Sequence, residues 1–165
     1  MANKTLILDE QKIALKLQRM AYQIWETNSA EKELVIAGVE GAGTIIAAHL
    51  ARYLKDISPL KITEITIVVN KKQPLHSPDT LAEDVSGKTV VLVDDVANSG
   101  RTLLYAIRPL LRYELKKIMV AVLIDRTHKS FPVSPDIVGH ALATTLQEHV
   151  EVECKGQQVK GVFLM

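Results

Sequence analysis

The sequence of 165 residues has only one cysteine, no long apolar run and almost no net charge. Cys154 alone cannot form an intramolecular disulfide or a thiolate metal cluster, which favours a reducing compartment. The longest apolar runs, such as 118–124, are far shorter than the roughly 20 residues that a membrane-spanning helix needs. The N-terminus shows no apolar signal region, so we expect a cytoplasmic protein without a membrane segment.

Charges of opposite sign nearly balance, because 20 Lys and Arg residues stand against 19 Asp and Glu residues, a formal charge of +1. Such a chain has no net field that could hold a nucleic acid or an anionic membrane by bulk attraction. Any anion must therefore bind at a local site. The length and the 47% hydrophobic content fit one domain with a full core, which we expect to span residues 1–165.

Helical patterns alternate with short apolar segments along the chain. An apolar stripe predicts an amphipathic helix from residue 9 to about residue 28, with Asp9 as its N-cap. Strands are predicted at 34–39, 62–69, 89–93, 118–124, 136–141 and 159–164, and further helices at 44–55 and 101–115, the last one kinked or shortened by Pro109. Apolar strands separated by helices indicate an α/β fold with a mainly parallel sheet covered on both faces.

In sheets of this kind, ligands bind beyond the carboxyl ends of the strands. The loops that follow the predicted strands are therefore the places to search for a site. They lie at 40–43, 70–87, 94–100 and 125–135, and all four are expected to open on one edge of the sheet.

The most informative segment joins the strand at 89–93 to the next helix. Two carboxylates, Asp94 and Asp95, precede a turn made of Val96, Ala97, Asn98, Ser99, Gly100, Arg101 and Thr102. Free N–H groups at the start of the helix and two hydroxyls would form a phosphate cradle, and Gly100 lets the backbone approach an anion. Carboxylates accept hydrogen bonds from a diol and hold Mg²⁺, so the combination indicates a ribose phosphate. Taken alone, these residues fit an ordinary turn equally well.

This segment resembles the ribose-phosphate signature of type I phosphoribosyltransferases, in which an apolar strand and an acidic pair precede a Thr/Ser-Gly-x-Thr turn. The likeness extends over most of the chain to the bifunctional pyrimidine-operon regulators and uracil phosphoribosyltransferases, through Ile7-Leu8-Asp9-Glu10-Gln11 and the segments 125–129 and 135–139. It implies a five-stranded parallel core with a small hood. It also implies transfer of a 5-phosphoribosyl group from phosphoribosyl pyrophosphate to a nucleobase, uracil favoured, with release of pyrophosphate.

The resemblance implies a role for each site segment. Asp94 and Asp95 would be catalytic and would hold the ribose diol and Mg²⁺, while residues 96–102 would bind the 5-phosphate. The residues implied for pyrophosphate are Glu40, Gly41, Ala42, Gly43, Lys71 and Lys72. Arg126 and the backbone near Val138 would contact the base or a nucleoside monophosphate. Members of the family are oligomers, so a homodimer or larger assembly is expected.

Several positions depart from the family pattern. Ala42 stands where the family usually carries an arginine, and Val69-Asn70-Lys71-Lys72 stands in place of an Arg-Asp-Asp run. Asn98 replaces a carboxylate that purine-specific relatives often have, and an amide cannot take a proton from the base, which disfavours a purine. The departures leave a second hypothesis open, a nucleotide-sensing protein that kept the phosphate cradle and lost efficient turnover. His128 and Lys129 either face the ligand or lie in a solvated loop.

RNA is an alternative partner that the sequence does not favour. Of the first-helix positions that the resemblance implies would touch RNA, Arg19 matches, whereas Gln18, Tyr22 and Thr27 depart, and Ser134 replaces a basic residue. Each lost cation removes part of the salt-dependent attraction to phosphates.

Overall fold

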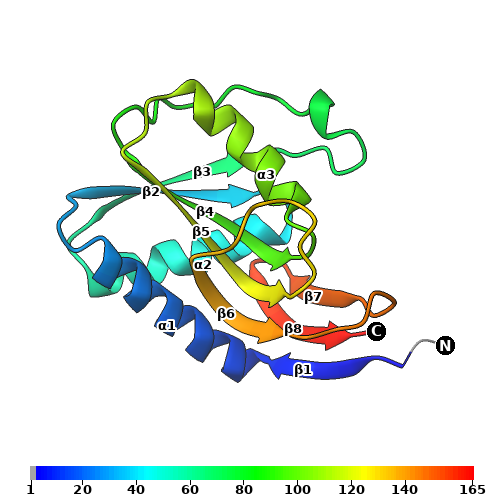
Figure 1. Cartoon of the computed structure of the whole chain (residues 1–165). Coiled ribbons are helices and arrows are strands. Elements are labelled where there is room, and N and C mark those ends of the chain that lie inside the picture. Colours follow the sequence, from blue (N-terminus) through cyan, green and yellow to red (C-terminus); the bar gives the residue numbers. More distant parts are fainter. Residues whose placement is uncertain (1–2) are drawn as a thin grey trace.

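The computed structural model describes residues 3–165 and contains a five-stranded parallel sheet with helices on both faces (Figure 1). The order of its strands is β3-β2-β4-β5-β6, and every neighbouring pair is parallel. The strands are β2 (Glu33–Val39), β3 (Lys61–Ile67), β4 (Thr89–Ala97), β5 (Lys117–Arg126) and β6 (Ile137–Leu142). The predicted α/β class and its parallel sheet are confirmed.

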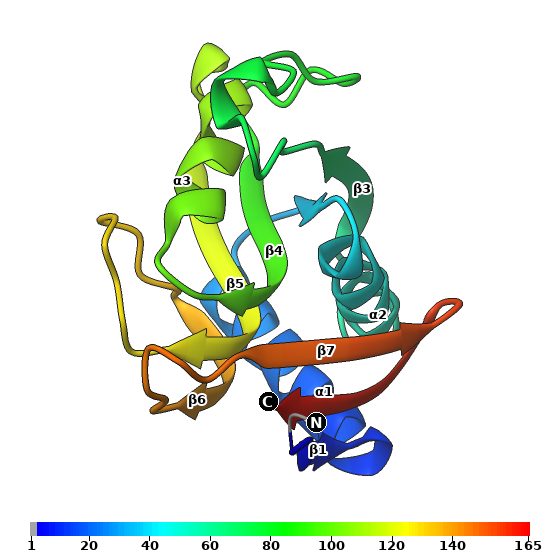
Figure 2. The same cartoon turned by 90° about the vertical axis from the view of Figure 1, so that its right-hand side faces the viewer.

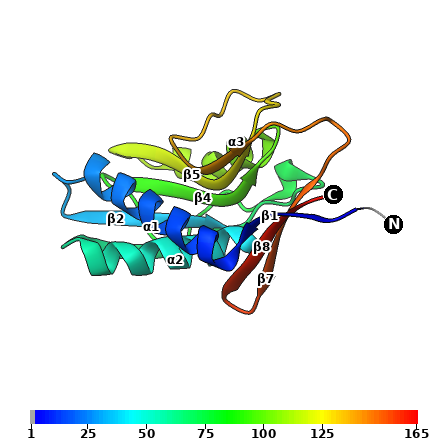
Figure 3. The same cartoon turned by 90° about the horizontal axis from the view of Figure 1, so that it is seen from below.

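Two helices, α1 (Glu10–Thr27) and α2 (Ala42–Ile57), cover one face of the sheet, and α3 (Arg101–Ile107) covers the other (Figure 3). Each face of the sheet carries an apolar core, and alternate residues of the central strands pack into one core or the other. In β4, Val91 and Val93 pack on the side of α1 and α2, whereas Val90 and Leu92 pack on the side of α3. Burial on both faces explains why the strands read as continuous apolar runs.

The first helix begins where the sequence predicts, and the third helix ends before the predicted residue 115. The Asp9 carboxylate accepts a hydrogen bond from the Lys12 N–H at 2.8 Å and so caps α1. The third helix is shortened, because α3 ends at Ile107 and the 3₁₀ turn η2 (Arg108–Arg112) follows, with Pro109 inside it. Among residues 3–165, no helix combines the length and the apolar character needed to cross a membrane.

A small antiparallel sheet of the order β1-β8-β7 forms the predicted hood. Its strands are β1 (Thr5–Asp9), β7 (Val150–Lys155) and β8 (Gln158–Leu164). Figure 2 shows β7 crossing the carboxyl end of β4. The sequence predicts β8 but misses β1 and β7. Both of these strands are held by pairing with β8, which for β1 lies at the other end of the chain. The short turn η1 (Pro74–His76) lies in the predicted long loop.

Two of the boundaries that differ from the prediction lie next to the acidic pair. The strand β4 continues to Ala97, because it stays paired with β5 as far as Asp125, so the acidic pair belongs to the strand and not to an exit loop. The helix α2 begins at Ala42, two residues before the predicted start at Thr44. The loop between β2 and α2 is therefore only two residues long, Glu40 and Gly41.

Candidate active site

The acidic pair lies at the carboxyl end of β4, next to the start of α2. Asp94 is 2% exposed, and its Oδ1 accepts the Asp95 N–H at 2.8 Å. The Asp95 carboxylate is half-buried and accepts the Val96 N–H at 2.8 Å. A Cβ placed on Gly43 would lie 3.0 Å from Asp94 Oδ1, so the first turn of α2 packs directly against this carboxylate.

Burial raises the pKa of Asp94 well above its ordinary value, and the charge of Asp95 raises it further. Lys71 lies near enough to oppose this shift, which places one of the two predicted loop cations beside the pair. The site therefore holds more negative charge than its surroundings balance, and a bound cation would relieve the repulsion.

The donor set suits Mg²⁺, which prefers oxygen ligands and is commonly held by one or two carboxylates together with substrate phosphates. Within residues 3–165, no three His, Cys, Asp or Glu side chains gather into a metal site. Asp94 and Asp95 would thus supply at most part of the coordination shell, and water or substrate oxygens would supply the rest.

The start of α2 is an anion-binding feature beside the pair. Gly41 has φ +100°, a conformation that favours glycine, and its carbonyl accepts both the N–H and the hydroxyl of Thr44. No side chain caps this helix of 16 residues. Its first N–H groups, at Ala42 and Gly43, have no partner within the helix, and the positive end of its dipole favours an anion there.

The predicted phosphate-binding segment follows on the other side of the pair. We call residues 98–102 the phosphate turn. A small hollow is lined by Val96–Leu103. Gly100 has φ +87°, and a Cβ on it would lie 3.1 Å from the Phe131 carbonyl oxygen, so the position requires glycine for both conformation and space. The carbonyl of Ser99 accepts the N–H groups of Ser130 and Phe131 at 2.9 and 3.0 Å.

The predicted flexible loop, residues 70–87, is held by hydrogen bonds near its start and by ion pairs at Asp79. The Asn70 side chain accepts the N–H groups of Lys72 and Gln73, and the Ser77 hydroxyl accepts the Asn70 N–H. Further along, Asp79 forms ion pairs with Arg112 at 2.6 Å and Arg108 at 3.7 Å. Lys71 and Lys72 are both exposed, and of the two only Lys71 acts on the pKa of Asp94.

Comparison with known proteins agrees with this arrangement. The model of the phosphoribosyl transferase domain matches residues 4–155. The bifunctional protein PyrR of Brevibacillus brevis is 34% identical over 163 residues, which cover 93% of this chain and 91% of the relative. The PyrR of Clostridium acetobutylicum is also 34% identical, covering 93% and 92%. The chain belongs to the phosphoribosyltransferase family.

Solved structures of phosphoribosyltransferases share the fold. A hypoxanthine-guanine phosphoribosyltransferase of Bacillus anthracis superimposes with a TM-score of 0.79 at 19% identity, covering 98% of this chain and 99% of that one. The hypoxanthine phosphoribosyltransferase of Trypanosoma cruzi gives 0.79 at 17% identity, with 95% of each chain covered. At such identities the likeness shows the α/β fold with its parallel sheet and small antiparallel sheet.

Arg126 joins three segments beside the candidate site. Its guanidinium donates to Asn98 Oδ1 at 3.0 Å, to the Thr144 hydroxyl at 2.8 Å and to the carbonyls of Thr145 and Glu148 at 3.1 and 2.8 Å. It therefore ties the phosphate turn to the loop 143–149. The sequence does not identify this loop, because no local motif links it to Arg126.

Val138, which the resemblance assigns to the base, lies on β6. In the strand ladder it is level with Val122 and with Asp94 of the acidic pair. Arg19 donates to the Val138 carbonyl at 3.1 Å and also to the carbonyl of Gly139. A carbonyl oxygen has two lone pairs, so the Val138 carbonyl can accept a further hydrogen bond, and its role in base binding stays a prediction.

The hood brings a residue to the site that the sequence analysis leaves aside. The thiol of Cys154, on β7, is half-buried, and burial together with the charge of Asp95 raises its pKa. The inner side of the hood therefore faces the acidic pair. No motif could reveal this neighbour, because it depends on how the two sheets pack.

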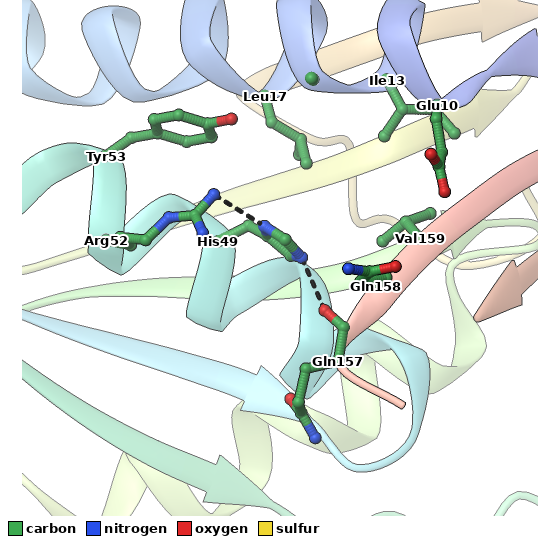
Figure 4. A pocket seen from close by; sticks show the side chains of 10 residues that line it. Glu10, Ile13, Leu17, His49, Arg52, Tyr53, Gln157, Gln158 and Val159 are labelled. Atoms are coloured by element: carbon green, nitrogen blue, oxygen red, sulfur yellow. Dashed lines mark hydrogen bonds between the residues drawn. The ribbon is translucent and has the colours of Figure 1, made fainter. Parts of the chain in front are cut away.

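A hollow lies elsewhere, between α1, α2 and the turn that joins β7 to β8 (Figure 4). It has a volume of about 460 Å³, and His49 Nε2 lies 2.8 Å from the Gln157 carbonyl oxygen at its wall. None of the predicted site residues lines it. This hollow is therefore separate from the candidate site at the acidic pair and the phosphate turn.

The burial of Asp94 predicts that removing its charge raises the free energy of unfolding. Because folding raises the pKa of Asp94 above its ordinary 3.8, the carboxyl lowers stability as the pH rises past that value. Asp94→Asn should therefore stabilise the phosphoribosyltransferase by about 1 kcal/mol, or about 3 °C in Tm, near pH 7, and the gain should shrink toward pH 4.

Thermal unfolding of the metal-free protein across this pH range measures the effect. Asp79→Asn is the matched control of opposite sign, since the hydrogen bond from Arg112 lowers the pKa of that exposed carboxyl. A lower Tm for Asp94→Asn at neutral pH would contradict the prediction.

Proposed function

We propose that this protein transfers a 5-phosphoribosyl group from phosphoribosyl pyrophosphate to a pyrimidine base, uracil favoured, and releases pyrophosphate. The observation that carries the proposal is the buried acidic pair between two backbone anion-binding features, the start of α2 and the phosphate turn. This spacing suits a ribose with a phosphate group at each end. Its diol would face Asp94 and Asp95.

The residues divide the chemistry between them. The bond from ribose C1 to pyrophosphate breaks early, leaving an oxocarbenium-like sugar, as in glycoside cleavage. The half-buried Asp95 carboxylate accepts hydrogen bonds from the diol and favours the positive charge on the sugar. The N–H groups of Ala42 and Gly43, with Lys71, stabilise the leaving pyrophosphate. Mg²⁺, when bound at Asp94 and Asp95, supplies further charge neutralisation for that leaving group.

The choice of base rests on Asn98. A guanidinium can only donate, so the bond from Arg126 fixes Asn98 Oδ1 as its acceptor and leaves the amide NH₂ for a ligand. An NH₂ group at the rim recognises a carbonyl oxygen or another acceptor on the base. It cannot act as the proton acceptor that purine-specific relatives often carry at this position, which disfavours a purine, and it can still donate to a carbonyl oxygen of uracil.

A second candidate is a nucleotide-sensing protein with weak turnover. It is favoured by Ala42, which supplies no charge where a pyrophosphate cation would stand, and leaves Lys71 as the nearest cation. RNA binding gains no support, because Arg19 is engaged with the carbonyls of Val138 and Gly139. The homo-oligomer and the cytoplasmic location stay predictions.

Turnover separates the two candidates. The purified protein is incubated with phosphoribosyl pyrophosphate, Mg²⁺ and each nucleobase in turn, and pyrophosphate release is measured. We expect release with uracil. If no base leads to pyrophosphate release and calorimetry shows tight binding of nucleoside monophosphates, the enzyme hypothesis is rejected and the sensor hypothesis is supported.

Asp95→Asn should weaken binding of ribose 5-phosphate about tenfold, because a charged acceptor for the diol becomes a neutral one. The melting temperature should stay nearly unchanged, since the side chain is only half-buried. Titration calorimetry and thermal unfolding measure the two effects, with the exposed Asp56→Asn as control. A large loss of stability with unchanged affinity would assign the pair a structural role instead.

Asn98→Asp should move base preference toward purines. The substitution keeps a partner for Arg126 but replaces the amide NH₂ with a carboxylate that can accept a proton from the base. We expect the ratio of kcat/KM for hypoxanthine to that for uracil to rise about tenfold or more. Gln11→Glu, which adds the same charge at an exposed position in α1, is the control. An unchanged ratio would show that Asn98 does not contact the base.

A further inference from the structure

Lys129 gathers the carbonyl groups on one side of the phosphate turn. Its Nζ lies 3.3 Å from the Ala97 carbonyl oxygen, 3.2 Å from that of Asn98 and 2.6 Å from that of Arg126, and it also pairs with the Asp125 carboxylate. The side chain is largely covered, with 23% of its surface exposed. Lys129 is thus neither a solvated residue nor one that points into the site.

The next residues continue the same pattern. The carbonyl of Ser99 accepts the N–H groups of Ser130 and Phe131. Three successive carbonyls, those of Ala97, Asn98 and Ser99, are therefore held by the segment 129–131.

The direction of these carbonyls fixes the direction of the N–H groups. The chain has no cis peptide among its described residues, and in a trans peptide the C=O and the N–H point in opposite directions. The N–H of Ser99 must therefore point away from Lys129, and the N–H of Gly100 away from Ser130. Within residues 3–165, neither of these two N–H groups donates to another group of the protein.

Without these contacts, a peptide of the phosphate turn could rotate and exchange the directions of its C=O and N–H groups. Gly100 lies at φ +87° and lacks a Cβ, so the peptide between Ser99 and Gly100 meets little steric resistance to rotation. A rotated peptide would direct the Ser99 carbonyl oxygen toward the hollow and repel a phosphate. The binding geometry therefore depends on the segment that holds the carbonyls.

We propose that Lys129 is a positioning residue, which keeps the N–H groups of the phosphate turn directed at the terminal phosphate of the ribose. This inference rests on the proposed function, because it assigns the turn to that phosphate. The charge of Lys129 is balanced by Asp125 and faces the carbonyl side of the turn. Its effect on the ligand is thus exerted through backbone orientation and not through direct attraction.

Binding of ribose 5-phosphate to the purified full chain tests the inference. Lys129→Met should raise Kd about tenfold, because the carbonyls lose their donor. Lys129→Arg, which keeps the charge and the donors, should stay within about threefold of the wild type. Lys117→Met, at the opposite end of β5, is the matched control and should bind normally.

Two further measurements separate positioning from direct attraction. A positioning effect persists between low and high salt, whereas attraction by an exposed charge fades as salt screens it. Amide NMR should show ligand-induced shifts at Ser99 and Gly100 in the wild type. The shift at Ser99 should be lost in Lys129→Met, because Lys129 holds the Asn98 carbonyl of the same peptide, whereas backbone N–H groups hold the Ser99 carbonyl that orients the Gly100 N–H. Loss of affinity that disappears at high salt, or unaltered affinity with retained amide shifts, would overturn the inference.

The remaining outcomes are also informative. If Lys129→Met does not fold, Lys129→Gln is judged by the same affinity and shift criteria. If the wild-type protein does not bind ribose 5-phosphate, the proposed function fails, and this inference fails with it. If the wild type binds and the Lys129 variants bind equally well, only the positioning role is rejected.

Discussion

Asp94 is buried where β4 meets α2, without a matching counter-ion. Burial of a charged carboxylate in this way costs free energy. Its neighbour Asp95 adds repulsion, and Gly43 packs so closely that a Cβ there would lie only 3.0 Å from Asp94 Oδ1. The structure tolerates the cost because both faces of the parallel sheet are filled with apolar side chains. A cation such as the proposed Mg²⁺ would relieve this repulsion.

Backbone groups do much of the remaining work that the proposed reaction requires. The start of α2 and the phosphate turn both present N–H groups, and each is held by contacts made on its other side. Thr44 holds the carbonyl of Gly41, and Lys129 holds that of Asn98. Orientation of dipoles before the ligand arrives is what makes such groups effective, because no reorganisation is then needed during the reaction.

Three segments that are distant in the sequence meet at the rim of the site. Arg126 connects the end of β5 with Asn98 and with the loop 143–149, while Cys154 places the hood beside Asp95. A base bound there would be enclosed by parts of the chain that share no local motif. Specificity can therefore change through the loop and the hood while the acidic pair and the phosphate turn stay constant.

The sequence by itself determined the parallel sheet, the acidic pair and the phosphate turn, because continuous apolar runs and a strand-to-helix motif are local features. Only the tertiary structure decided where β4 ends, since its last residues are strand only through pairing with β5. It also decided the hood, because β1 pairs with β8 from the other end of the chain. The roles of Arg126 and Lys129 depend on the same kind of distant contact, in which carbonyl groups and side chains separated by many residues come within hydrogen-bond reach.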